Sequence, residues 1–229
     1  RRFECANISE GRRKVIGTLV SSYDFFARYA RTEDWQRGDV SAVSDRPALD
    51  RWIKSRVTAC ASSCTLAFGD LEPARALKAI ETLVNDELSN WYIRRNRRRF
   101  WNADDKVSQQ HAFDTLWEVL TDVSKLIAPV TPFLAESLWQ RLHGEAESIH
   151  LAGYPPTDGF RDLDLEGAMA PILSAASLGR SVRERVQIRV RQPLSKLMVH
   201  VAGADKLKIS PREYGDSLLQ ELNIKEVEW

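Results

Sequence analysis

The chain has 229 residues, of which 43% are hydrophobic and 28% charged, and these values exclude a disordered or collagen-like protein. No uninterrupted apolar run approaches the ~20 residues that a membrane-spanning helix needs. Lys and Arg number 33 against 32 Asp and Glu, so the formal net charge is only +1. Any contact with nucleic acid must therefore come from a local basic cluster.

Apolar residues at spacings of three and four predict helices through the first two-thirds of the chain. The expected helices cover residues 9–30, 45–69, 70–101, 106–127 and 131–142. We expect Asp45 to cap the second helix, with Pro47 in its first turn, and Thr131 to cap the fifth. The predicted core contains Trp52, Trp91, Trp117 and Trp139, and the apolar face of the fifth helix includes Phe133.

A linker rich in glycine and proline follows at residues 143–159. Beyond it the pattern predicts a helix over 165–186, short strands over 186–190 and 197–201, a helix over 212–222 and a strand over 224–229. The fold class is therefore mainly α, an antiparallel helical bundle followed by a small α+β appendix. We place the domains at residues 1–152 and 153–229.

The three cysteines are an odd number, which argues against a disulfide framework and for a reducing compartment. Cys60 and Cys64 lie one helical turn apart, with no second Cys/His pair nearby, so small buried thiols are favoured over a zinc site. The chain begins at Arg1 without an initiator Met or a signal segment, and we expect it to be a piece of a longer protein.

Known catalytic patterns are absent from the sequence. It contains no Gly-rich phosphate loop of Walker or Rossmann form and no Gly-x-Ser-x-Gly elbow. The histidines at 111, 143, 150 and 200 are scattered, and none forms a two-His metal spacing. We therefore expect neither a catalytic residue nor a metal ligand in this chain.

The unusual feature is WYIRRNRRRFW at residues 91–101, with five arginines within six residues and aromatic residues on both sides. Arginine binds phosphate bidentately and stacks on bases, which suits RNA. At ~100° per residue, however, the five arginines spread over about half of a helix. Arg95 and Arg98 fall near the continuation of the apolar stripe that ends at Trp91. We expect one or more of the five to pair with a carboxylate on a neighbouring helix.

A second basic stretch lies where the sixth helix gives way to the predicted strand. Arg183 and Glu184 stand among mixed charges, which favours a solvated helix end. Alternation would place Arg189 and Arg191 on one face of an extended segment.

Several segments resemble isoleucyl-tRNA synthetases, in the same order along nearly the whole chain. They are RPALDRWIKSR at 46–56, NDELSNWYIRR at 85–95 running on to Trp101, APVTPFLAE at 128–136, VRQPL at 190–194 and ELNIKEV at 221–227. The second of these is specific to the isoleucine branch of the class I enzymes. The resemblance implies the helical anticodon-binding domain and the junction that follows it.

The resemblance further implies a cytoplasmic ligase that joins isoleucine to its tRNA with ATP and Mg²⁺, through an adenylate and then transfer to the tRNA 3′ end. Relatives also hydrolyse mischarged valyl-tRNA in an editing domain. The His-x-Gly-His and Lys-Met-Ser-Lys-Ser signatures are missing here, and KLKIS at 206–210 is only a superficial echo. The implied partners are isoleucine tRNA and the catalytic and editing domains of the same polypeptide, with no membrane, and this chain alone should catalyse nothing.

The expected tRNA contacts share a basic or aromatic side chain beside these motifs. They are Arg94, Arg95, Arg97, Arg98, Arg99, Trp101, Arg189 and Arg191. We expect Trp101 to be a buried side chain that closes the helix, with base stacking as the alternative. Three rival interpretations stay open: a stand-alone helical RNA-binding or scaffold module, the same domain of a valine- or leucine-specific synthetase, and a bundle whose arginines are purely structural.

Overall fold

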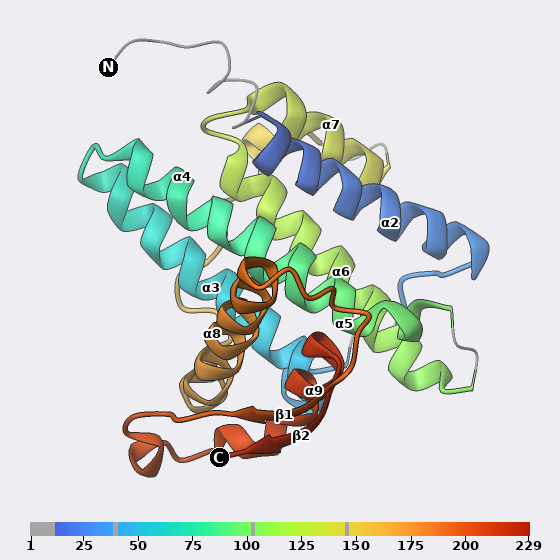
Figure 1. Cartoon of the computed structure of the whole chain (residues 1–229). Helices are drawn as coiled ribbons and strands as arrows, with labels where there is room; N and C mark the ends of the chain where they lie inside the picture. Colours follow the sequence, from blue (N-terminus) through green and yellow to red (C-terminus); the bar gives the residue numbers. More distant parts are fainter. Residues whose placement is uncertain (1–11, 39–40, 102–103, 145–146) are drawn as a thin grey trace. The chain divides into compact units, whose positions relative to one another are not determined.

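The computed structural model describes residues 12–38, 41–101, 104–144 and 147–229 (Figure 1). The chain divides into two compact units, residues 1–161 and 162–229, and each is described by itself. The boundary predicted from the sequence lies after residue 152. Cys5 and the beginning of the first expected helix, residues 9–11, lie outside the described residues.

The first unit is a helical bundle, which confirms the predicted fold class (Figure 1). Its long helices are α2 (Thr18–Thr32), α3 (Ala48–Gly69), α4 (Pro73–Thr82), α6 (Lys106–Ile127) and α7 (Pro132–His143). Helix α4 continues through a π-helical stretch, η3 (Leu83–Ile93), into α5 (Arg94–Asn96) and the 3₁₀ turn η4 (Arg97–Phe100). A π-helical turn, η1 (Arg12–Gly17), precedes α2, and shorter 3₁₀ turns are η2 (Val43–Asp45) and η5 (Ile149–Leu151).

Helix α3 is the centre of the bundle, because it packs against α4, η3 and α6. Helix α2 covers η3 and α6, and α7 lies against α6 (Figure 1). The fully buried side chains include Trp52, Trp91, Tyr92, Phe100 and Phe113. Trp52, Trp91 and Trp117 belong to the core as predicted, whereas Trp139 is only half-buried.

Two sequence predictions about helix starts and faces are wrong. Helix α3 begins after Pro47, not at Asp45, because Arg46 precedes a proline and is extended (φ −81°, ψ 159°). Phe133 is 91% exposed, since it lies two residues, or ~200° of helix, before the buried Ala135. Thr131 stands at the N-cap position of α7 but makes no capping hydrogen bond.

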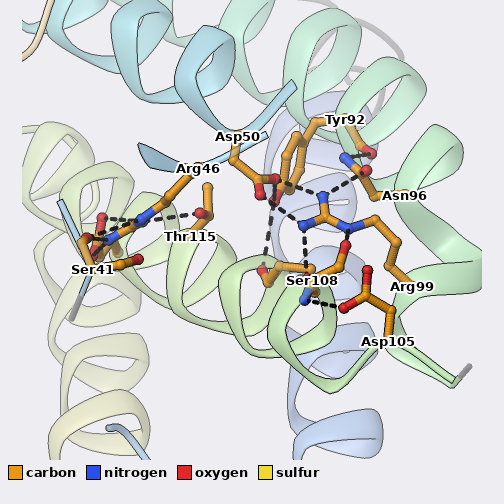
Figure 2. Close-up of polar contacts among 11 residues, drawn as sticks. Ser41, Arg46, Asp50, Tyr92, Asn96, Arg99, Asp105, Ser108 and Thr115 are labelled. Atoms are coloured by element: carbon orange, nitrogen blue, oxygen red, sulfur yellow. Dashed lines mark hydrogen bonds and ion pairs between the residues drawn. The ribbon is translucent and has the colours of Figure 1, made fainter. Parts of the chain in front are cut away.

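A buried arginine joins the loop before α3 to α6 (Figure 2). Arg46 is 3% exposed, and its guanidinium donates to the Ser41 carbonyl, to Thr115 Oγ1 and to both carboxylate oxygens of Glu118 at 2.8 and 3.1 Å. Lys54 adds an ion pair to Glu118 at 3.3 Å. All five N–H donors of Arg46 are therefore satisfied inside the protein.

The second unit contains α8 (Leu163–Arg185), β1 (Leu194–Met198), α9 (Asp216–Leu222) and β2 (Ile224–Glu228), with 3₁₀ turns η6 (Ala204–Lys206) and η7 (Pro211–Tyr214). The two strands pair in parallel, with Leu194 opposite Ile224, and α9 lies on the crossover between them. The predicted strand over 224–229 is confirmed. The strand expected over 197–201 lies earlier, at Leu194–Met198, and residues 199–201 are not part of it.

The predicted strand over 186–190 is wrong, because these residues form the turn that ends α8. Gln187 adopts a left-handed conformation (φ 57°), and the Ile188 N–H donates to the Arg183 carbonyl at 2.9 Å. This is the usual way in which a helix satisfies its last carbonyl groups.

The Arg46–Glu118 pair makes stability depend on pH. Burial raises the pKa of Glu118, but hydrogen bonds from Arg46 and the charge of Lys54 outweigh burial and hold this pKa below its usual value. A lowered pKa stabilises the fold above the unfolded-state pKa of about 4.3, and the contribution is lost as pH falls through the folded-state value. We expect Glu118→Gln to lower the unfolding free energy at pH 7 by about 2–3 kcal/mol, with the difference shrinking toward pH 3.

Urea unfolding followed by tryptophan fluorescence measures this difference, because six of the seven tryptophans lie in the first unit. The matched control is Glu72→Gln, which removes an exposed pair with Arg75 and should cost well under 1 kcal/mol. A constant difference between Glu118→Gln and the unmodified protein from pH 7 to pH 3 would contradict the prediction.

Candidate nucleic-acid interface

The arginine-rich run lies where the winding of one long helical segment changes from π through α to 3₁₀. The 3₁₀ turn ends at Phe100, which is fully buried and packs edge-on against Phe25 and Phe113 at ring distances of 5.0 Å. This aromatic contact fixes the end of the segment between α2 and α6.

Arg99 points into the protein rather than toward solvent (Figure 2). Its Nη1 and Nη2 donate to the two carboxylate oxygens of Asp50 at 2.9 and 2.8 Å, and Nη1 also donates to Asn96 Oδ1 at 3.0 Å. The remaining donors reach Ser108, its hydroxyl at 2.9 Å and its carbonyl at 2.7 Å. All five N–H donors are used, so Arg99 has none left for a phosphate.

Asp50 is fully buried in α3 and also accepts a hydrogen bond from the Tyr92 hydroxyl at 2.7 Å. Burial and the charge of Asp50 raise the pKa of Tyr92 well above its usual value. Burial works against the charge of Arg99, but the hydrogen bond and the charge of Asp50 outweigh it and raise the pKa of Arg99. The expected pairing of one clustered arginine with a carboxylate on a neighbouring helix is therefore confirmed.

Arg95 also packs inward, since its guanidinium lies over the ring of Trp91 at 5.3 Å and the residue is only partly exposed. Its predicted place on the continuation of the apolar stripe is confirmed. The same prediction for Arg98 is wrong, because Arg98 is exposed. Four residues separate Arg95 from Arg99, so the two inward arginines share one side of the segment.

Arg94, Arg97 and Arg98 are exposed, and with Trp101 they follow the spacing of a single helix face. Arg97 lies over the Phe25 ring at 5.8 Å. The expectation that Trp101 is buried is wrong: Trp101 is 44% exposed and its ring lies 5.5 Å from that of Tyr29. Phe100, one position earlier, takes the buried place instead.

This exposed face, which we call the arginine face, consists of Arg94, Arg97, Arg98 and Trp101. It combines cationic groups suited to phosphate with an aromatic ring that already rests on a second ring. The buried Asp50–Arg99 pair lies on the other side of the same segment and holds it against α3. The geometry therefore fits contact with the backbone and bases of a nucleic acid.

In the second unit, Arg189 and Arg191 are exposed in the turn between α8 and β1. They do not alternate along a strand, because the Gln192 N–H donates back to the Arg189 carbonyl at 3.0 Å. Asn223 Nδ2 donates to the Arg191 carbonyl at 3.0 Å and so pins the turn.

Arg183 is 3% exposed, and the prediction of a solvated helix end there is wrong. Its guanidinium donates to the carbonyls of Arg189 at 3.1 Å and Leu222 at 2.6 Å, so it ties the end of α8 to α9 and the turn. Arg180 pairs with Glu221 on the same side.

The sequence pattern did not predict the structural roles of Arg46, Asp50 and Asn223. A signal existed for Asp50, because it lies three residues before Ile53 and seven before Val57, on the buried side of α3. Arg46 and Asn223 lie outside the helices and contact loop carbonyl groups, Arg46 also contacting α6, and periodicity carries no signal for such residues.

Cys60 and Cys64 are free and buried, with their sulfurs 3.9 Å apart, which agrees with the expectation of buried thiols on one helix face. Among the described residues, no three His, Cys, Asp or Glu side chains gather as a metal site would require. Within the same residues no helix is long and apolar enough to cross a membrane.

Residues 50–198 match the family described as the anticodon-binding domain of tRNA ligase. Curated relatives include isoleucine–tRNA ligases of Porphyromonas gingivalis, 38% identical over 99% of this chain, and of Streptomyces avermitilis, 39% identical over 98%. The enzyme of Deinococcus radiodurans is 36% identical over 99% of the chain. The chain spans only 20–21% of the length of these relatives.

The Asp50–Arg99 pair should be a main support of the first unit. We expect Asp50→Asn to lower the unfolding free energy by about 3–5 kcal/mol, because it leaves a largely buried guanidinium without its counter-charge. Chemical denaturation at pH 7 measures the loss. Asp70→Asn, which removes an exposed partner of Arg75, should cost less than about 1 kcal/mol. Equal losses in the two variants would refute the assignment.

Proposed function

The chain belongs to the family of anticodon-binding domains of tRNA ligases, and from this we propose that it binds the anticodon stem-loop of isoleucine tRNA. In this proposal it positions the tRNA for ATP-dependent isoleucylation by a longer polypeptide. The relatives in which the same region occurs are named isoleucine–tRNA ligases, which supports the choice of amino acid.

The observation that carries the proposal is the arginine face. Three exposed arginines and the half-exposed Trp101 follow one side of a helical segment whose other side is anchored by Asp50 and Arg99. Backbone phosphates would bind the guanidinium groups, and an unstacked loop base could stack on Trp101, whose ring lies 5.5 Å from that of Tyr29. Arg189 and Arg191 are weaker candidates for phosphate contact in the second unit.

Catalysis would lie elsewhere in the polypeptide. ATP, Mg²⁺ and the adenylate chemistry would belong to a catalytic domain, and hydrolysis of mischarged tRNA to an editing domain, in the cytoplasm. The described residues would supply a surface for binding and positioning. Arg46 and Arg99 would not contribute to it, because their guanidinium groups are used in structural contacts. This chain would supply orientation of the tRNA rather than a reacting group.

The arginine face predicts a specific loss of electrostatic binding. We expect the double variant Arg97→Ala/Arg98→Ala to weaken binding to all tRNAs alike and to reduce the slope of log K against log salt concentration by about two. Fluorescence anisotropy with labelled tRNA at three salt concentrations measures both quantities.

The control for this experiment is Arg75→Ala, at the beginning of α4 and, at ~1.5 Å per residue, on the order of 30 Å along the helical segment from Arg97. It should leave the slope unchanged. If the slope of the double variant equals that of the unmodified chain, Arg97 and Arg98 do not contact phosphates. A purely structural cluster would then be favoured.

Specificity distinguishes the proposal from its rivals. We expect the chain to bind isoleucine tRNA about tenfold more tightly than valine or leucine tRNA, a difference of ~1.4 kcal/mol. Preference for valine or leucine tRNA would point to a neighbouring synthetase. Equal binding of all three and of unrelated structured RNA would instead favour a general RNA-binding or scaffold module.

A further inference from the structure

A groove of about 530 Å³ lies between α8 and β1, within the second unit. Helix α8 lines it with one side, which includes Leu178 and, one turn later, Val182. The segment 194–202, which begins with β1, lines it from the other direction. Leu222 of α9 and Ile224 of β2 complete the apolar lining.

Large apolar side chains of this groove are exposed. Leu178 and Val182 are 67% and 53% exposed, and Met198 of β1 is 76% exposed. Single apolar residues scattered over a surface are ordinary, whereas apolar residues gathered in a groove are typical of interaction sites. The groove is therefore a candidate surface for a partner that would cover these side chains.

The polar members of the lining argue against a small polar ligand. Arg183 is buried and donates to backbone carbonyl groups, and Lys196 pairs with Glu228 at 2.6 Å. Ser174 and His200 are exposed. Among the described residues, no buried polar side-chain atom that lacks a hydrogen-bond partner belongs to this lining. Because small polar molecules are oriented by converging polar groups, the groove suits an apolar partner better.

Strand β1 offers such a partner an open edge. It pairs with β2 alone among the described residues, and the two strands are parallel. Parallel sheets usually have more strands and both faces covered, whereas Lys196 and Met198 of β1 are exposed. Charges often protect a free edge, but the charge of Lys196 is paired with Glu228, and Leu197 and Val199 are apolar. A further strand could therefore pair with β1.

Most of the polypeptide in which this region occurs lies outside these residues. The chain spans 20–21% of the isoleucine–tRNA ligases to which it is similar, so about four-fifths of each relative consists of other segments. Segments of one polypeptide meet at an effective concentration on the order of millimolar when the linker allows it. This advantage favours an occupant from the same polypeptide over a second copy of the chain.

We propose that a β-strand from another part of the same ligase polypeptide pairs with the open edge of β1 and places apolar side chains against Leu178 and Val182. Main-chain hydrogen bonds to β1 would supply affinity, and the groove would select the side chains. The second unit would then help to fix the anticodon-binding region to the rest of the enzyme. The proposal rests on the family to which the chain belongs and not on RNA binding by the arginine face.

Hydrogen–deuterium exchange tests this proposal by comparing the 229-residue chain with the full-length polypeptide that contains it. The amides of β1 that do not pair with β2 should exchange about tenfold more slowly in the full-length protein, because a strand partner protects them. Sedimentation of the 229-residue chain should show a monomer.

The variant Leu178→Glu/Val182→Lys places charges in the groove in an order that suits an α-helix. It should leave the thermal unfolding of the 229-residue chain almost unchanged, because both side chains are exposed there. In the full-length protein it should remove the tenfold protection of β1. Leu163→Glu, a 66% exposed residue of α8 outside the groove, is the matched control and should change neither protein. Leu178→Glu alone replaces the double variant if the latter does not fold.

Equal exchange of the β1 amides in the two proteins would overturn the proposal. Protection that persists in the full-length Leu178→Glu/Val182→Lys variant would also overturn it, because the partner would then not lie in the groove. A dimer of the 229-residue chain that protects β1 would assign the groove to a second copy instead. None of these measurements involves tRNA, so they leave the proposed function untouched.

Discussion

The ion pair between Asp50 and Arg99 is the constraint on which the exposed face of the bundle depends. It brings the end of the η3–α5–η4 segment against α3, and Ser108 extends the contact to α6. Once Arg99 is turned inward and Phe100 is buried, helical geometry sends Arg94, Arg97 and Arg98 outward. A structural contact thus decides which members of a basic run can meet a ligand. The density of arginines in a sequence is therefore a poor measure of the charge presented at the surface.

Buried arginines hold irregular backbone in place by hydrogen bonds to its carbonyl groups. Arg46 holds the loop before α3, and Arg183 holds the turn after α8 through carbonyl groups far along the chain. The rigid, planar guanidinium presents five donors and can bind several acceptors at once, which a lysine cannot do. The chain carries many arginines and is still nearly neutral because 32 Asp and Glu balance 33 Lys and Arg. Arg46 and Arg99 are paired with carboxylates inside the protein. The exposed arginines of the arginine face form a local cluster.

In the proposed function, the arginine face would attract a nucleic acid by its charge. Exposed guanidinium groups supply long-range attraction that salt weakens. This face lies on one helical segment, so bracing of that segment by Asp50 and Tyr92 would hold it in place.

The sequence by itself determined the helical bundle and its order, because apolar periodicity over long helices is a strong local signal, and the resemblance to isoleucyl-tRNA synthetases is confirmed. It also indicated that one clustered arginine would be paired. Only the tertiary structure decided that this is Arg99, that Trp101 is exposed, and that Arg183 is buried. Those outcomes depend on partners far away in the sequence, such as Asp50, 49 residues from Arg99, and Leu222, 39 residues from Arg183. The turn at Gln187, which replaces the strand predicted over 186–190, likewise depends on how α8 ends. A local pattern cannot encode which distant carboxylate or carbonyl a side chain will meet, and that is where prediction from the sequence ended.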